Sequence, residues 1–321
     1  MDARSSSQPL HTIVQHLSTN PPVRRIVPTP LDLATAELRG RRAWERNPGA
    51  REGALRTMEA IVGGTERAGE LEGLARRWLI EANVQAALFW RPWKAPSLDN
   101  ESRERLAAAL ATGRGVLLSS CHLGPFFLAL GAVATVRPRT FSTAGGWLFE
   151  QAEGVWGRRI ERWHRGVAER GETMLRSGGA FERLVGLLEQ GEVLRLPIDM
   201  PGSVQTNFLG KPVELAGGTA RLAMHTEALV LPIHTLRNGI RVSTTIGEAL
   251  DPRDCSGTPE LHQSLARVHE QVILQAPEQL ESPNRPGAWE GGASADGWMR
   301  PGDPPAPGEK PAGARMRPPG P

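Results

Sequence analysis

The chain has 321 residues, of which 39% are hydrophobic and 23% are charged, so it is long enough to bury a large core. Its formal net charge of +3 is too small to indicate a nucleic-acid-binding protein, although it suits contact with anionic head groups or an acidic carrier protein. Two cysteines, Cys121 and Cys255, exclude a disulfide framework and a four-cysteine zinc site, and no stretch reads as a secretory leader. We therefore expect a cytoplasmic protein.

The N-terminal part is predicted to be helical after a flexible leader. Residues 1–28 are polar and lack periodicity, so we expect them to stay flexible. Residues 29–95 are rich in Ala, Leu, Glu and Arg, which favours two or three helices. Ser97 is expected to cap a further short helix. In the clearest helix an apolar face recurs at intervals of three and four residues: Leu71, Leu74, Ala75, Trp78, Leu79, Ala82 and Ala86.

A glycine-bounded apolar run at residues 115–121 predicts a buried strand, followed after Gly124 by a helix packed against it. His122 thus follows the carboxyl end of a strand, where open α/β sheets bind ligands. From position alone two interpretations stay open: a functional imidazole, or a side chain that only caps the turn. Residues 116–136 approach membrane-spanning length, but their Gly, Pro and His residues favour a strand-turn-helix unit.

The middle of the chain adds a second strand at residues 140–143 and a basic amphipathic helix at 153–170. The arginines of that helix indicate either a solvated cover over the sheet or contact with an anionic bilayer. A helix at 181–188 leads to an apolar run at 193–198, which predicts a strand that ends at Asp199. Asp199 is therefore a second polar residue at a strand terminus.

The last third is predicted to begin with a loop at 200–212 and a helix at 220–227. Strands at 229–234 and 240–246 and a helix capped by Thr258 follow. Residues 281–321 are dominated by Pro, Gly and charge and are expected to be disordered. The predicted fold is a single α/β domain at 29–280, in which helices flank a central mixed sheet and residues 29–95 form a helical N-terminal part.

Six segments carry a family resemblance by their order and spacing: Gly115-Val116-Leu117-Leu118 leading to His122-Leu123-Gly124, residues 188–193 leading to Asp199, residues 208–213, residues 218–223, residues 228–232, and Ala276-Pro277-Glu278-Gln279. Together they resemble the lysophospholipid acyltransferase superfamily. The most similar branch is that of the bacterial lipid A late acyltransferases and phosphatidylinositol mannoside acyltransferases.

The resemblance implies an α/β acyltransferase in which His122 takes a proton from an acceptor hydroxyl that attacks an acyl thioester. The donor would be acyl carrier protein or a coenzyme A thioester, the acceptor a lipid, glycolipid or related metabolite, and no cofactor, metal or nucleic acid would be needed. A peripheral contact with the anionic inner face of a bacterial cell membrane is also implied. The candidate substrate-binding residues are Gly124, near the oxyanion, the phosphate-binding Arg158, Arg159, Arg162 and Lys211, and Phe208 and Gly210.

The chain departs from the family pattern at the closing motif, where Leu280-Glu281-Ser282-Pro283 replaces the usual aromatic and basic residues, and at the position of the catalytic acid. Phe127 stands where the family carries the Asp or Glu that orients the histidine. An apolar neighbour is expected to lower the pKa of His122, because it disfavours the imidazolium. Asp199, which we take as the second catalytic residue, and Glu150 are the candidates for a relocated acid.

Three alternatives follow from this departure: a weak enzyme, an enzyme with a relocated acid, or a noncatalytic lipid-binding or accessory relative. A hydrolase built on Cys121 is disfavoured, because adjacent side chains at a strand end diverge. A carboxylate within hydrogen-bond reach of the His122 imidazole would favour the relocated acid.

Overall fold

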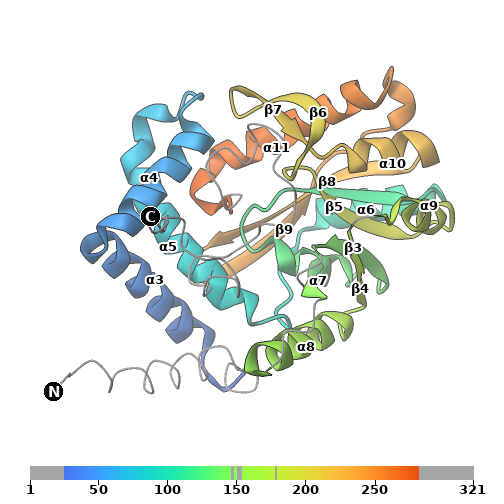
Figure 1. The fold of residues 1–321 in the computed structure, drawn as a ribbon. Coiled ribbons are helices and arrows are strands. Elements are labelled where there is room, and N and C mark those ends of the chain that lie inside the picture. The colour runs from blue at the N-terminus through green and yellow to red at the C-terminus, as the bar shows by residue number, and fades with distance from the viewer. Residues whose placement is uncertain (1–24, 146–147, 150–153, 178, 282–321) are drawn as a thin grey trace, which may run out of the picture.

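The computed structural model describes residues 25–145, 148–149, 154–177 and 179–281 (Figure 1). The N-terminal part of this range is helical, as predicted, with α3 (Thr29–Arg46), α4 (Pro48–Val62), a short η1 (Ala68–Glu70) and α5 (Leu71–Phe89). Asn47 separates the first two helices, and its side chain accepts a hydrogen bond from the Ala50 amide at 3.1 Å. Together with Pro48 in the first turn, this cap starts α4 at a defined point.

The predicted helix cap at Ser97 is wrong. Ser97 lies in a two-residue strand, β1 (Ser97–Leu98), and Asp99 caps the following helix α6 (Asn100–Ala111). The Asp99 carboxylate accepts a hydrogen bond from the Ser102 amide at 2.7 Å. An Asp at this position satisfies an amide that the first helical turn leaves unpaired.

The central sheet has the strand order β1-β9-β8-β2-β5-β3-β4. Its remaining members are β2 (Val116–Ser120), β3 (Thr140–Ala144), β4 (Glu172–Arg176), β5 (Val193–Pro197), β8 (Leu229–Asn238) and β9 (Arg241–Ile246). Only the β8–β9 pair in this sheet is antiparallel. The prediction of a central mixed sheet flanked by helices is confirmed.

Helices cover both faces of the sheet, because alternate residues of the apolar strands enter different hydrophobic clusters. Leu118 packs with α6 and α7 (Ala129–Val133), which follows the short η2 (Phe126–Leu128). Leu117 packs in the cluster that includes α9 (Phe181–Glu189), α10 (Gly218–Thr226) and α11 (Thr258–Gln275). The basic helix α8 (Gly154–Ala168) adds its own small cluster with the end of α5.

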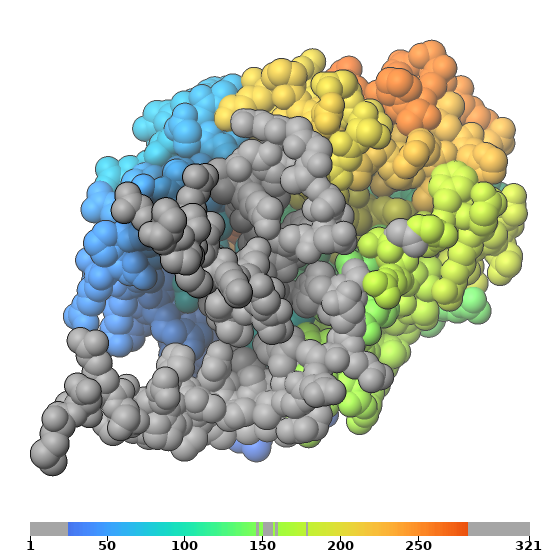
Figure 2. All heavy atoms as spheres, viewed as in Figure 1, coloured from blue at the N-terminus to red at the C-terminus, as the bar shows by residue number. Residues whose placement is uncertain are grey.

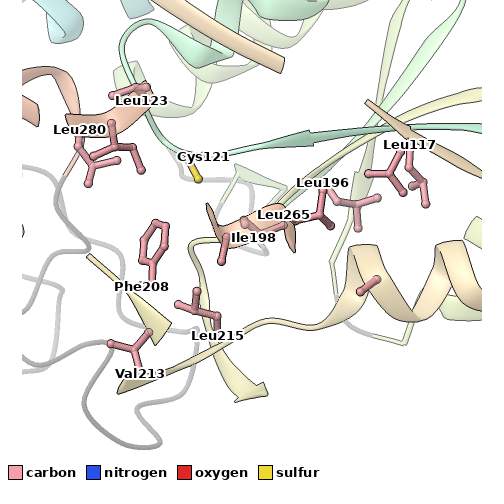
Figure 3. Packing of buried hydrophobic residues seen from close by; sticks show 14 of the residues in the cluster. Leu117, Cys121, Leu123, Leu196, Ile198, Phe208, Val213, Leu215, Leu265 and Leu280 are labelled. Atoms are coloured by element: carbon pink, nitrogen blue, oxygen red, sulfur yellow. The ribbon is translucent and has the colours of Figure 1, made fainter. Parts of the chain in front are cut away.

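The loop predicted at 200–212 is instead a hairpin of β6 (Pro201–Phe208) and β7 (Lys211–Leu215). Phe208, Val213 and Leu215 are buried in the main core, and Phe208 points toward Cys121 and Leu280 (Figure 3). In the space-filling view the hairpin (yellow) lies between the N-terminal helices (blue) and the helices α10 and α11 (orange) (Figure 2). The hairpin therefore joins the N-terminal part to the rest of the domain.

Two smaller elements complete the chain, η4 (Pro252–Asp254) and η5 (Pro277–Gln279). At the start of α11 the cap position is Gly257 rather than Thr258, so the predicted cap is displaced by one residue. Within the described ranges, no helix combines the length and apolar character that crossing a membrane requires. The predicted leader and tail lie largely outside these ranges, since residues 1–24 and 282–321 are not described.

Candidate active site

The parallel pairing of β2 with β5 brings the two predicted catalytic residues together. Val116 pairs with Val193, and the register continues without a shift to Ser120 and Pro197. Beyond the strand ends, the Ile198 amide still donates to the Ser120 carbonyl at 2.9 Å. His122 and Asp199 follow two residues after the last paired residue of each strand, so they stand at the same edge of the sheet.

His122 and Asp199 are joined by two hydrogen bonds. The imidazole Nδ1 lies 2.9 Å from Asp199 Oδ1, and the His122 amide donates to Asp199 Oδ2 at 2.8 Å. A carboxylate is an acceptor only, so this geometry fits an imidazole that carries its proton on Nδ1. The side chains are 13% and 2% exposed, which keeps the pair largely away from solvent. A carboxylate that follows β5, the strand paired with β2, thus lies on the imidazole.

Burial and charge act in opposite directions on His122. Burial lowers the pKa of this imidazole, but the charge and hydrogen bond of Asp199, with a smaller contribution from Glu281, outweigh it and raise the pKa above its ordinary value. Arg195 opposes this rise. The predicted lowering of the His122 pKa is therefore wrong, because it neglected the carboxylate across the strands.

Phe127 does not take the place of an orienting acid but packs elsewhere. Its ring lies 5.4 Å from that of Phe89, in an edge-on contact with the end of α5. The ring that packs on the imidazole belongs to Phe126, with a centroid distance of 4.5 Å to His122 and an interplanar angle of 72°. Phe126 thus forms the apolar contact beside the imidazole, while Phe127 packs on the end of α5.

The closing segment after α11 holds the turn that carries His122. The Gly124 amide donates to the Gln279 carbonyl at 2.8 Å, and the Glu281 amide donates to the His122 carbonyl at 2.7 Å. Between them, Leu123 and Leu280 form an isolated antiparallel bridge. The Gln279 side chain in turn bonds the backbone amide and carbonyl of Arg237, both at 2.9 Å.

Gly124 has a structural reason to be glycine. Its φ of +60° lies in the left-handed region, and an added Cβ would stand 2.1 Å from the Thr235 carbonyl oxygen. Its own amide donates to the Gln279 carbonyl and so shapes the turn, while the contact of backbone N–H groups near Gly124 with an oxyanion stays a prediction.

The other predicted substrate-binding residues occupy two regions. Phe208 is buried in the core that includes Cys121 and Leu123, the neighbours of His122. Gly210 packs against Gly64, and Lys211 Nζ lies 3.4 and 3.5 Å from two carbonyls at the end of α4. Arg162 is exposed on α8. The side chains of Arg158 and Arg159 on the same helix, and all of Glu150, lie outside what the structure describes.

Sequence reasoning missed three residues around the dyad: Phe126, Gln279 and Arg195. Arg195 left a signal as a charged residue within an apolar strand, and Gln279 left one as the last residue of a segment that carries the family resemblance. The contacts of Phe126 and Gln279 depend on the three-dimensional path of the chain. No group of three His, Cys, Asp or Glu side chains that could hold a metal ion occurs in the described part of the chain.

Comparison with known proteins finds a family model that spans the residues of the site. The family model described as "Bacterial lipid A biosynthesis acyltransferase" matches residues 82–280. The chain belongs to this family. As a family member it is placed among acyltransferases of lipid biosynthesis, and both His122 and Asp199 fall within the matched residues.

Among solved structures, this acyltransferase family member is similar to the 1-acyl-sn-glycerophosphate (LPA) acyltransferase PlsC from Thermotoga maritima, with 16% sequence identity and a TM-score of 0.40. That similarity covers 64% of this chain and 83% of the PlsC chain. A comparison with curated proteins finds no match.

Proposed function

We propose that the protein transfers an acyl group from an acyl carrier protein or coenzyme A thioester to a hydroxyl of a lipid or glycolipid. The observation that carries this proposal is the hydrogen bond of 2.9 Å between His122 Nδ1 and Asp199 Oδ1, in a chain of the lipid A acyltransferase family. A noncatalytic relative would have no need to keep a buried carboxylate on the imidazole, because burying a charge is costly. The geometry therefore favours the enzyme with a relocated acid.

In the proposed reaction, His122 Nε2 removes the proton from the acceptor hydroxyl as the oxygen attacks the thioester carbonyl. A carbon–oxygen bond forms and the carbon–sulfur bond breaks. The departing thiolate takes the proton back from the imidazolium, so the enzyme ends in its starting state. Asp199 holds the Nδ1 proton in place and stabilises the imidazolium while it exists.

We further propose that the protein contacts the anionic inner face of the membrane through α8. Ile160, Trp163 and Val167 are buried against the domain, which turns Arg162 and Arg165 outward. Exposed arginines on an amphipathic helix attract anionic lipid head groups. The acceptor lipid would then meet the enzyme at the bilayer surface.

A vesicle assay tests both proposals. Acyl transfer from carrier-protein and coenzyme A donors is measured on anionic vesicles that contain candidate lipid acceptors, for wild type, His122→Ala and the exposed-site control His225→Ala. His122→Ala should lower the rate by about 10²–10⁴-fold while the control leaves it unchanged. Undiminished transfer by His122→Ala would rule out the base role.

Sedimentation of the same samples addresses the membrane contact. The protein should sediment with vesicles at low salt and be released at high salt, because screening weakens surface charge interactions. Absence of binding at low salt would contradict the membrane contact and would mean that the outward face of α8 is only solvated.

A further inference from the structure

Arg195 is a charged residue in the middle of a central strand. It is 7% exposed, and its neighbours in the register are Leu118 on β2 and Ser142 on β3. Arginine is rarely buried so completely, because removing a guanidinium from water costs several kcal/mol unless partners replace the lost hydration. We therefore ask which contacts of Arg195 compensate for this cost and what they do.

The partners of Arg195 offset its charge only in part. Burial lowers the Arg195 pKa, and attraction from Glu172 and Asp199 opposes that effect. Glu172 is itself bonded by the Ser142 hydroxyl at 2.6 Å and also attracts a second arginine, Arg170. Within the described residues, Arg195 Nε is buried with no hydrogen-bond partner. The attraction to Glu172 and Asp199 therefore leaves one buried donor of Arg195 unsatisfied.

The remaining contacts of Arg195 lead toward the dyad. Nη1 donates to the Phe126 carbonyl at 3.1 Å, and the guanidinium carbon lies 5.6 Å from the centre of the Phe126 ring. The same ring packs edge-on against the His122 imidazole at 4.5 Å. Arg195 thus holds both the backbone and the side chain of the residue that supports the imidazole.

We propose that Arg195 is a positioning residue for acyl transfer, which holds the Phe126 turn against the His122 imidazole from within the sheet. This inference rests on the proposed function.

A second effect follows from the positive charge of Arg195. The charged groups acting on His122 are Asp199 and Glu281, which favour the imidazolium, and Arg195, which opposes it. By opposing it, Arg195 keeps more of the imidazole in the neutral form that accepts a proton.

An NMR titration of the His122 imidazole tests the inference without relying on turnover. Wild type, Arg195→Gln, Arg195→Lys and the exposed control Arg183→Gln are compared. In Arg195→Gln the pKa of His122 should rise by about 0.5–1.5 units, because a nearby positive charge is lost. Arg195→Lys and Arg183→Gln should leave it unchanged. A His122 pKa in Arg195→Gln equal to that of wild type would overturn the charge effect.

Kinetics of Arg195→Lys and Phe126→Leu test the positioning role. Arg195→Lys keeps a positive charge but loses the planar guanidinium, whereas Phe126→Leu keeps Arg195 but loses the aromatic ring. In both variants kcat should fall by about tenfold while KM and the melting temperature stay near wild type. Unchanged kcat in both variants would overturn the positioning role, and these variants still report if Arg195→Gln does not fold. If wild type shows no acyl transfer, the proposed function fails while the titration still decides the link between Arg195 and His122.

Discussion

Ser119, His269 and His234 form a second buried polar chain, on the opposite face of the strand that precedes His122. Ser119 Oγ lies 2.8 Å from His269 Nε2, and His269 Nδ1 lies 2.9 Å from His234 Nε2. Burial lowers the pKa of His234 to about 4. Burial also holds the pKa of His269 well below its ordinary value, and the neighbouring His234 lowers it further. Both imidazoles are therefore neutral in the folded protein, and each can donate or accept within the chain.

The buried histidines of this hydrogen-bonded chain predict that the folded protein loses stability in acid. Below pH 6.5 the unfolded chain takes up protons on these histidines, whereas the folded His234 takes one up only near pH 4. Stability should thus fall as the pH is lowered from 6.5 to 4, since each unit of depressed pKa is worth about 1.4 kcal/mol. Thermal melting of His269→Gln should depend less on pH in this range than wild type, whereas the exposed His225→Gln should behave like wild type. An equal pH dependence in all three proteins would contradict this account.

At the scale of elements, the β6–β7 hairpin depends on a close backbone contact at its turn. Gly210 has a φ of +74°, and an added Cβ would stand 1.9 Å from the Gly64 carbonyl oxygen. Gly239, at the turn between β8 and β9, has a φ of +60° but open space around it. The two positions therefore share the conformational requirement and differ only in the contact.

The two glycines make a matched pair of substitutions. Gly239→Ala should cost about 1 kcal/mol from its left-handed conformation alone. Gly210→Ala should cost about 2–4 kcal/mol, because the hairpin must also move away from Gly64. Denaturant unfolding of both variants measures the difference. Equal losses would show that the contact with Gly64 contributes nothing.

The elements themselves could be predicted from the sequence where apolar runs are bounded by glycine, as at β2 and β5. The hairpin was missed because its exposed positions are polar and Pro and Gly suggested a loop, while its buried Phe208, Val213 and Leu215 contact distant segments. The edge strand β4 was also missed, since Glu172–Arg176 is short and charged at both ends. Asp199 was found as a strand-end residue, but its bond to His122 depends on the parallel register, which no local pattern fixes.

At the scale of the whole molecule, the closing segment connects the N-terminal helices to the dyad. Gln85 Nε2 on α5 donates to the Gln279 carbonyl at 2.8 Å, and the Trp78 indole donates to the Leu280 carbonyl at 2.9 Å. Arg237, which the Gln279 side chain bonds, is itself buried and also forms ion pairs with the partly exposed Glu81 and Glu37. The turn that carries His122 is thus fixed by β5 on one side and by α5 through the closing segment on the other.

The central claim is that Asp199 serves as the acid that position 127 lacks, and kcat/KM of acyl transfer by Asp199→Asn across pH tests it most directly. Wild type and the exposed control Asp254→Asn are measured beside it, with circular dichroism to check folding. We predict that Asp199→Asn lowers kcat/KM by about 10²–10⁴-fold. Because the carboxylate raises the pKa of His122, the loss of activity on acidification should also move to lower pH. A folded Asp199→Asn protein with the turnover and pH profile of wild type would contradict the account.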